Sequence, residues 1–158
     1  MGVADFDHTA FEIIGATGFA EIGIATGSNG RFKTFADMVA FARANPREVT
    51  VAANIGLPVH FVPMRLAQAA GVELRYVQVG GGARRYQSLV GGHTDIAMFS
   101  LSELLQFGQT GLSSIVLLSE QRSSQLPDVP TAKELGLDVV STSGRIWLAP
   151  KRTPPDRL

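Results

Sequence analysis

The chain alternates short apolar runs with segments that carry helix-start signals, and this alternation constrains its fold more than any other feature. The runs with the length and content of buried strands are residues 49–53, 73–79, 94–99 and 113–119. One intervening helix is predicted to begin at Pro58 or Pro63, since proline is tolerated in a first helical turn, and another spans residues 83–90. Strands that alternate with short helices predict an α/β fold: an open, mostly parallel sheet flanked by helices.

Helix starts are also marked by capping boxes, in which a serine or threonine is followed three residues later by an acidic residue. The chain contains three such pairs: Thr34 with Asp37, Ser100 with Glu103, and Thr131 with Glu134. The helices that they open are predicted to end near Ala44, Gly108 and Gly136, at an Asn-Pro pair or at a glycine. Three capped helices therefore add to the alternating pattern.

Strands are predicted near both ends of the chain. Residues 11–17 and 20–26 lie on either side of Gly18, which predicts two short strands or one long bent strand. The predicted strands near the C-terminus are residues 139–143 and 145–149. Residues 153–158 then open a helix, with threonine at the N-cap and proline at the first position, that has no length to continue. We therefore expect the sequence to be cut from a longer protein, or to come from a gene that lost its end.

The composition excludes several classes of protein. Fourteen basic residues balance fourteen acidic ones, so no overall charge attracts nucleic acid or an anionic membrane. Because there is no cysteine, the chain has no disulfide and no thiolate metal site. No apolar run reaches the ~20 residues of a transmembrane helix, and the first residues lack the basic and apolar regions of a signal peptide.

Two loops are candidates for a ligand site. Residues 52–57 and 80–82 each follow a predicted strand and precede a predicted helix, at the sheet edge where open α/β proteins bind ligands. Glycines let backbone amides approach an anion, and a helix N-terminus adds positive potential. Arg84 and Arg85 follow the second loop. The alternative, that the glycines only turn the chain while the arginines are solvated, stays open.

The sequence offers little for catalysis. His60 and His93 adjoin loops and His8 lies near the start, but no two histidines have the spacing of a helical zinc site. No nucleophile elbow or nucleotide-binding glycine motif occurs. We therefore predict neither an enzyme nor a bound metal or cofactor. A small hydrolase or transferase whose catalytic residues meet only in space remains the alternative.

Residues 125–137, QLPDVPTAKELGL, closely resemble the solute receptors of tripartite tricarboxylate transporters, also called the Bug family. Further matches follow in the family's order along nearly the whole chain: residues 41–46, Gly56, His60, Leu89, residues 91–92, residues 95–96 and residues 147–150. The resemblance implies one lobe of a type II periplasmic-binding-protein-like fold. It places the ligand-binding lobe at residues 27–137, with crossing strands at residues 1–26 and 138–158.

The resemblance also implies a function. Family members are periplasmic, extracytoplasmic solute-binding proteins, not enzymes, which close on a small mono-, di- or tricarboxylate and deliver it to a membrane permease. The ligand-binding positions that it implies in this sequence are Ala53, Asn54, Gly56, Leu57, His60, Gly80, Gly81, Gly82, Phe99 and Ser100. No nucleic acid and no cofactor is expected as a partner.

Several positions depart from the family's pattern. Residues 52–57 lack its usual serine or threonine, residues 78–81 lack its tyrosine and base, and Phe99 stands where it has an aspartate. These changes predict a less charged or more apolar ligand, or a lobe that no longer binds the family's ligands. The alternative function is a truncated receptor lobe that acts as an interaction module and forms a homodimer through exposed strands.

Overall fold

A computed structural model describes residues 5–154 and 157. Contacts within the chain divide it into two compact units. The larger unit, Ala20–Thr142, contains four α-helices and most of the sheet. The smaller unit combines the chain up to Phe19 with the chain from Ser143 onward, and it contains a short 3₁₀ helix, η1 (His8–Ala10).

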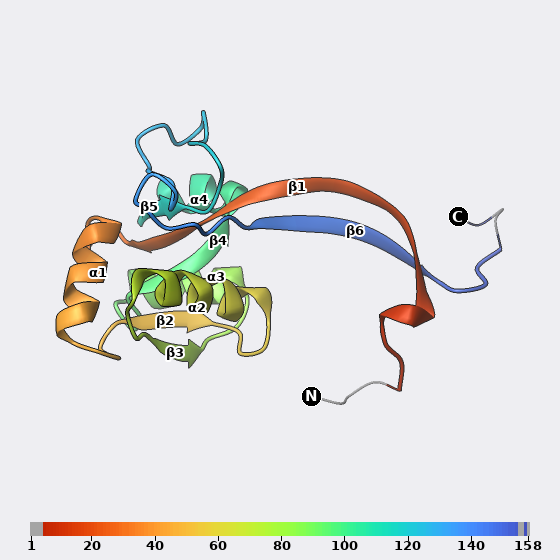
Figure 1. Ribbon diagram of the computed structural model, residues 1–158, viewed down its shortest axis with the longest axis horizontal. Coiled ribbons are helices and arrows are strands. Elements are labelled where there is room, and N and C mark those ends of the chain that lie inside the picture. The colour runs from red at the N-terminus through yellow and green to blue at the C-terminus, as the bar shows by residue number, and fades with distance from the viewer. Residues whose placement is uncertain (1–4, 155–156, 158) are drawn as a thin grey trace. The chain divides into compact units, whose positions relative to one another are not determined.

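The sheet of the larger unit is mixed and open (Figure 1). Its strands lie in the order β3 (Arg75–Gln78), β2 (Thr50–Ala53), β4 (Ile96–Ser100), β1 (Phe11–Gly27) and β5 (Leu112–Leu117). β2 runs parallel to β3 and to β4, whereas β1 runs antiparallel to β4 and to β5. Four strands therefore point one way and β1 runs against them, which confirms the predicted mostly parallel α/β sheet.

β1 is one long strand rather than two, so the second of the two predictions for this segment is correct. Gly18, at the predicted break, adopts φ = 152° and adjoins the boundary between the two units. Within the smaller unit β1 pairs with β6 (Thr142–Pro150), and the indole N–H of Trp147 donates to the Thr17 hydroxyl at 3.3 Å.

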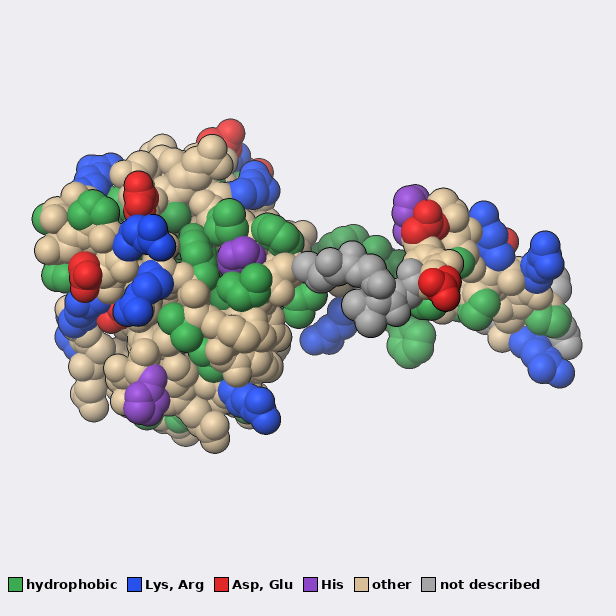
Figure 2. All heavy atoms as spheres, turned by 90° about the horizontal axis from the view of Figure 1, so that it is seen from below, with side chains coloured by type: hydrophobic (Ala, Val, Ile, Leu, Met, Phe, Trp, Pro, Cys, Tyr) green, Lys and Arg blue, Asp and Glu red, His purple; other side chains and the backbone are tan. Residues whose placement is uncertain are grey.

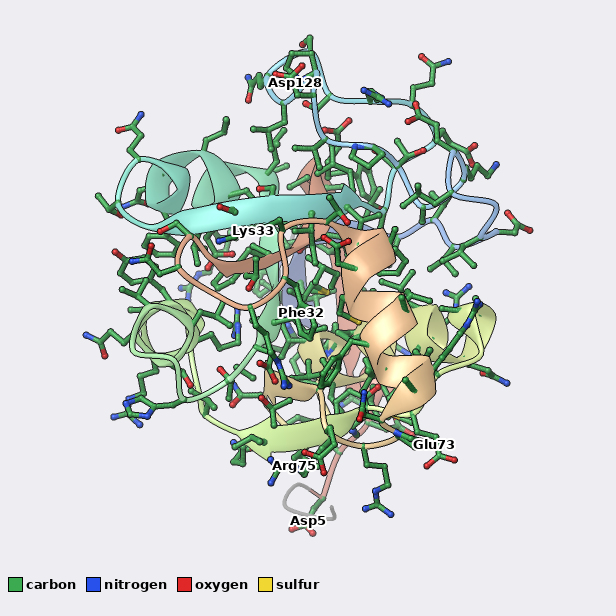
Figure 3. All side chains as sticks on the ribbon, turned by 90° about the vertical axis from the view of Figure 1, so that its left-hand side faces the viewer. Asp5, Phe32, Lys33, Glu73, Arg75 and Asp128 are labelled. Atoms are coloured by element: carbon green, nitrogen blue, oxygen red, sulfur yellow. The ribbon has the colours of Figure 1, made fainter. Side chains whose placement is uncertain are left out.

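Successive residues of the central strands point to opposite faces of the sheet, and each face has its own core. One face carries Ile24, Val51 and Ile96, which pack with residues of α1 (Phe35–Ala44) and α2 (Pro58–Ala70). Phe32, in the loop before α1, lies inside this core (Figure 3). The other face carries Ala25, Ala52, Ala97 and Phe99, which pack with residues of α3 (Gly82–Val90) and α4 (Leu101–Gly108). Helices thus flank both faces, as predicted.

Two of the three predicted capping boxes open helices. The Thr34–Asp37 box begins α1 and the Ser100–Glu103 box begins α4. α2 begins at Pro58, so Pro63 lies inside the helix rather than at its start.

The third predicted helix, at residues 131–136, is wrong, because this stretch forms only turns. The Thr131 hydroxyl accepts from the Glu134 amide at 3.2 Å, which makes half of a box. The other half is missing because the Glu134 carboxylate accepts from Arg122 instead, at 2.8 Å. Backbone hydrogen bonds tie Leu117 to both sides of Thr131, so the segment is held beside β5 as an isolated bridge.

The strand predicted over residues 139–143 is also wrong for most of its length, since β6 begins at Thr142. Val139 is buried, and the Ser141 amide donates to the Leu118 carbonyl at 2.8 Å, but these residues form no ladder. The helix start predicted at residues 153–158 falls largely on residues 155, 156 and 158, which lie outside the described residues.

Candidate ligand-binding site

The predicted ligand loops lie together at one edge of the sheet. β2, β3 and β4 are parallel, so their carboxyl ends meet there, and each strand leads through a short connection into a helix N-terminus. This edge carries all ten predicted residues. Ala53 to His60 connect β2 to α2, Gly80 to Gly82 connect β3 to α3, and Phe99 and Ser100 end β4.

α2 and α3 begin without a side-chain cap. Their N-cap residues, Leu57 and Gly81, make no capping hydrogen bond. The first amides of any helix have no partner within the helix. At α3 these amides belong to Gly82, Ala83 and Arg84, and the helix dipole adds partial positive charge at the same place. The start of α3 therefore presents donors suited to an anion. At α2, Pro58 has no N–H and the His60 amide donates to the Leu57 carbonyl at 2.8 Å, which leaves the Val59 amide in the first turn.

Gln78 links the end of β3 to the loop before α2, a role that sequence reasoning missed. Its side-chain oxygen accepts from the Ile55 amide at 2.7 Å, and its side-chain nitrogen donates to the Asn54 side chain at 3.0 Å. Gln78 ends its strand directly opposite Ala53, the last residue of the neighbouring strand, and this register is visible only in the structure. A glutamine at that register reaches across to the adjacent loop and fixes its conformation.

His60 supports the loop before α2. Its Nδ1 accepts from the Gly56 amide at 3.3 Å, and its ring packs edge-on against Tyr76 with 5.0 Å between ring centroids. Burial raises the pKa of Tyr76 to about 12. Gly56 has φ = 86°, a conformation that glycine adopts without strain. His60, two residues after Pro58, is therefore held between the Gly56 amide and the ring of Tyr76.

Arg85 is buried and Arg84 is exposed, so the two adjacent arginines differ. Arg85 is only 6% exposed, donates from Nη1 to the Gly80 carbonyl at 3.1 Å, and stacks over the Phe99 ring at 5.3 Å. Its Nε is buried without a partner among the described residues. Burial lowers the pKa of Arg85, and the negative charge of Glu103 acts in the opposite direction. Through its hydrogen bond to the Gly80 carbonyl, Arg85 thus holds the glycine loop from the side of the core.

Ser100 and Phe99 have structural partners. The Glu103 carboxylate accepts from both the amide and the hydroxyl of Ser100, each at 2.9 Å. Phe99 is 1% exposed and belongs to the core. A Cβ added at Gly82 would collide with the Glu103 side chain, so this carboxylate also lies against the start of α3. The structure brings these two predicted residues to the edge of the sheet but leaves their side chains engaged within the protein.

The loop before α2 adds apolar surface to the site. Ile55 is 50% exposed and Leu57 48% exposed. The site thus combines backbone donors with apolar side chains.

The residues that the structure describes include neither a metal-binding cluster nor a membrane-spanning helix. Among residues 5–154 and 157, no group of three acidic, histidine or cysteine side chains is placed to hold a metal ion. None of the helices in the described part of the chain is long and apolar enough to cross a membrane.

Comparison with known proteins identifies the family. The family model described as "Tripartite tricarboxylate transporter family receptor" matches residues 5–158. A protein of Cupriavidus necator, named as the UPF0065 protein in the gbd 5′ region, is 31% identical over 144 residues, which are 90% of this chain and 44% of that protein. The chain therefore spans less than half the length of this relative.

Solved structures show the same fold. MatC of Rhodopseudomonas palustris with bound malate superposes with a TM-score of 0.83 and 21% identity, over 92% of this chain and 51% of that one. A second Rhodopseudomonas palustris protein, with adipate, gives a TM-score of 0.84 and 22% identity, over 96% of this chain and 52% of that one. The family model covers nearly the whole sequence. The chain therefore belongs to the tripartite tricarboxylate transporter receptor family.

Proposed function

We propose that this chain is the ligand-binding lobe of an extracytoplasmic solute receptor that binds a small organic acid and supplies it to a membrane permease. The observation that carries the proposal is the pair of uncapped helix starts at α2 and α3, side by side at the carboxyl edge of the sheet. The first-turn amides of Gly82, Ala83 and Arg84 at α3, together with that of Val59 at α2, favour a carboxylate without requiring a basic side chain. We place the lobe at residues 27–137 and the crossing strands at residues 1–26 and 138–158.

The neighbouring side chains narrow the class of acid. Ile55 and Leu57 are exposed at the start of α2, and Gln78 holds their loop in place. At the start of α3 the protein's own carboxylate, Glu103, already lies against Gly82. A second negative charge there would meet repulsion at short range. A monocarboxylate with an apolar chain, whose hydrocarbon part lies against Ile55 and Leu57 at the α2 side, fits this arrangement best. The predicted contacts of Ala53, Asn54, Gly56, His60 and the glycine loop belong to this proposal.

A panel of acids tests the proposal by isothermal calorimetry and thermal unfolding of the whole chain. The panel compares malate and adipate with a branched monocarboxylate, and each acid with its amide. An acid that binds stabilises the folded state by mass action, and its amide does not. Equal responses to acid and amide would remove the carboxylate from the proposal.

A second candidate function rests on the smaller unit. Ile13 is 72% exposed, Phe19 71% and Trp147 62%, which is unusual for large apolar side chains. An interaction module would cover them with a second copy of the chain. Light scattering separates the two functions: the module predicts a dimer that Trp147→Ser weakens, whereas the receptor lobe predicts acid binding that this substitution leaves unchanged.

A further inference from the structure

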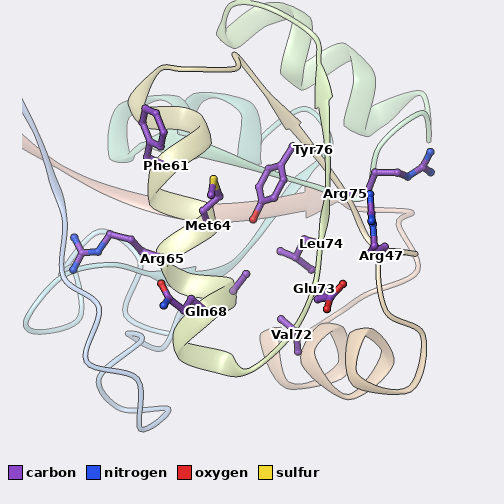
Figure 4. A pocket seen from close by; sticks show the side chains of 11 residues that line it. Arg47, Phe61, Met64, Arg65, Gln68, Val72, Glu73, Leu74, Arg75 and Tyr76 are labelled. Atoms are coloured by element: carbon purple, nitrogen blue, oxygen red, sulfur yellow. The ribbon is translucent and has the colours of Figure 1, made fainter.

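A groove separate from the ligand loops runs between α2 and the segment that leads into β3 (Figure 4). Its volume is about 920 Å³. Met64 on α2 and Leu74 and Tyr76 on the opposite side face one another across it. Phe61 and Met64 are 51% and 41% exposed, so the groove is lined by apolar side chains that no described residue covers.

One wall of the groove is an open sheet edge. β3 is the first strand of the sheet order and pairs only with β2. The amides of Arg75 and Val79 donate to the carbonyls of Val49, just before β2, and of Ala53, at the end of β2, at 2.9 Å each. Because backbone groups alternate in direction along a strand, those of Tyr76 and Gln78 point to the free edge. An extended segment placed there would form strand hydrogen bonds and turn alternate side chains toward α2.

The margins of the groove are basic. Arg65 stands on the α2 side, and Arg47 and Arg75 stand on the β3 side, against one acidic residue, Glu73 (Figure 4). All three arginines are exposed, and none forms an ion pair with another described residue. The surrounding chain is neutral overall, so this local excess of positive charge marks the groove. Figure 2 shows hydrophobic side chains gathered on this side of the larger unit, with Lys and Arg around them.

We propose that this groove binds an acidic, extended peptide segment of a partner protein, which adds a strand to the edge of β3. Its backbone bonds to the free edge at Tyr76 and Gln78, its apolar side chains enter the space between α2 and β3, and its carboxylates meet the arginines. A second copy of this chain is disfavoured as the occupant, because two such edges would bring their arginines together. The groove has a lining different from the loops proposed to bind the organic acid, although it adjoins the loop before α2 through Tyr76, which packs against His60, and through Gln78.

The probe is a short fluorescent peptide that alternates glutamate with leucine or phenylalanine. Binding to the full chain is measured by anisotropy at low and at physiological salt. Two matched peptides accompany it: one with lysine in place of glutamate, and one N-methylated at alternate amides. We expect the acidic peptide to bind, the lysine peptide to bind at least about tenfold more weakly, and N-methylation to weaken binding by a similar factor. Higher salt should weaken binding because rim charges are screened.

Substitutions locate the peptide on the protein. Arg65→Glu and Arg75→Glu, both at exposed positions, should each weaken binding by about tenfold, and Phe61→Ser by a similar factor. Lys151→Glu changes the net charge equally at an exposed position outside the groove and should leave binding unchanged.

Four outcomes of the peptide-binding measurements would overturn the proposal. These are no binding of the acidic peptide, equal binding of the lysine peptide, equal binding of the N-methylated peptide, and equal weakening by Lys151→Glu. A dimer in solution that Arg75→Glu disperses would assign the groove to a second copy instead, and would overturn it as well.

Discussion

The four helices of the larger unit begin in two different ways. α1 and α4 begin with capping boxes: the Asp37 amide donates to the Thr34 hydroxyl, and the amides of Thr34 and Ser100 donate to the carboxylates of Asp37 and Glu103. α2 and α3 begin at Leu57 and Gly81 without any side-chain cap. A capping box satisfies one amide of the first turn and the amide of the N-cap residue, whereas a start without a side-chain cap leaves these groups to water, a ligand or backbone carbonyls. By this difference, α1 and α4 have starts that stabilise the lobe, whereas α2 and α3 have starts suited to contacts with a ligand.

The two uncapped starts also differ from each other. The α2 start has exposed apolar side chains, Ile55 and Leu57, and is supported by His60. The α3 start is made of glycine, with Arg85 below it and Glu103 against it. The first suits the hydrocarbon part of a ligand, and the second already contains a positive and a negative charge. This contrast underlies the proposal that an organic acid with an apolar chain binds at this edge.

The largest expected effect comes from Glu103→Ala. It removes the acceptor of the Ser100 amide and hydroxyl. It also removes the negative charge that favours the charged form of the buried Arg85. We expect the free energy of unfolding to fall by about 2–3 kcal/mol, measured by urea denaturation. Glu134→Ala is the control, because its ion pair with Arg122 is exposed and should contribute less than about 1 kcal/mol. Equal losses in the two variants would contradict the role given to Glu103.

Thr34→Ala and Leu57→Ala compare the two kinds of helix start directly. Thr34 accepts from the Asp37 amide at 3.1 Å, so its loss should lower the unfolding free energy by about 1 kcal/mol. Leu57 makes no capping bond and is 48% exposed, so its truncation should change stability by less than about 0.5 kcal/mol. Both values come from the same denaturation experiment. A larger loss at Leu57 would mean that α2 is held at its start by contacts other than a cap.

Gly81→Ser converts an uncapped start into a capped one. Gly81 has extended backbone angles, φ = −65° and ψ = 174°, and an added Cβ would meet nothing within 4 Å. The new hydroxyl should bond to an amide of the first turn of α3, with a gain of about 0.5 kcal/mol in stability. The same bond should weaken the binding of an organic acid several-fold, measured by calorimetry. If acid binding is unchanged, α3 does not take part in it.

Tyr76→Phe tests the support beneath the α2 start. The folded-state pKa of Tyr76 is raised to about 12 by burial, above its ordinary value of 10.0. The folded state therefore holds this proton more tightly than the unfolded state does. The resulting stability is fully present below pH 10 and is lost as pH rises toward 12. The phenolate absorbance of the wild type, minus that of Tyr76→Phe, should rise with a midpoint near pH 12. A midpoint near 10 would place the hydroxyl in water.

The sequence predicted the parts of the fold that local signals control. The Thr34 and Ser100 boxes and the strand-helix alternation follow from neighbouring residues, and the structure confirms them. The Thr131 box carries the same local signal, but Arg122 takes the Glu134 carboxylate and hydrogen bonds to Leu117 hold the segment. Contacts with residues that are distant in sequence therefore decide that no helix forms after Thr131. The spacing of residues within the segment gives no information about these contacts.

The candidate site shows the same limit. Its loops follow from where strands end and glycines begin, and they lie at the expected edge. The sequence did not distinguish Arg84 from Arg85, because either of two adjacent residues can face the sheet. Leu89, four residues after Arg85 and buried on the same helix face, was the available signal. The cross-link made by Gln78 depended on strand register, which becomes known only once the sheet order is known.

The position of β1 has a consequence for how the chain acquires its structure. β1 precedes every other strand in sequence, yet it lies between β4 and β5, which are made much later. Thr26 pairs with Ile96 and with Ser113, so both partners must be present before this strand can be held on its two sides. Contacts between residues so distant in sequence form slowly, because a long loop must close first. We expect β2, β3 and β4, with α2 and α3 between them in sequence, to assemble first. β1, the first strand of the chain, should then be the last to pair with its neighbours in the sheet.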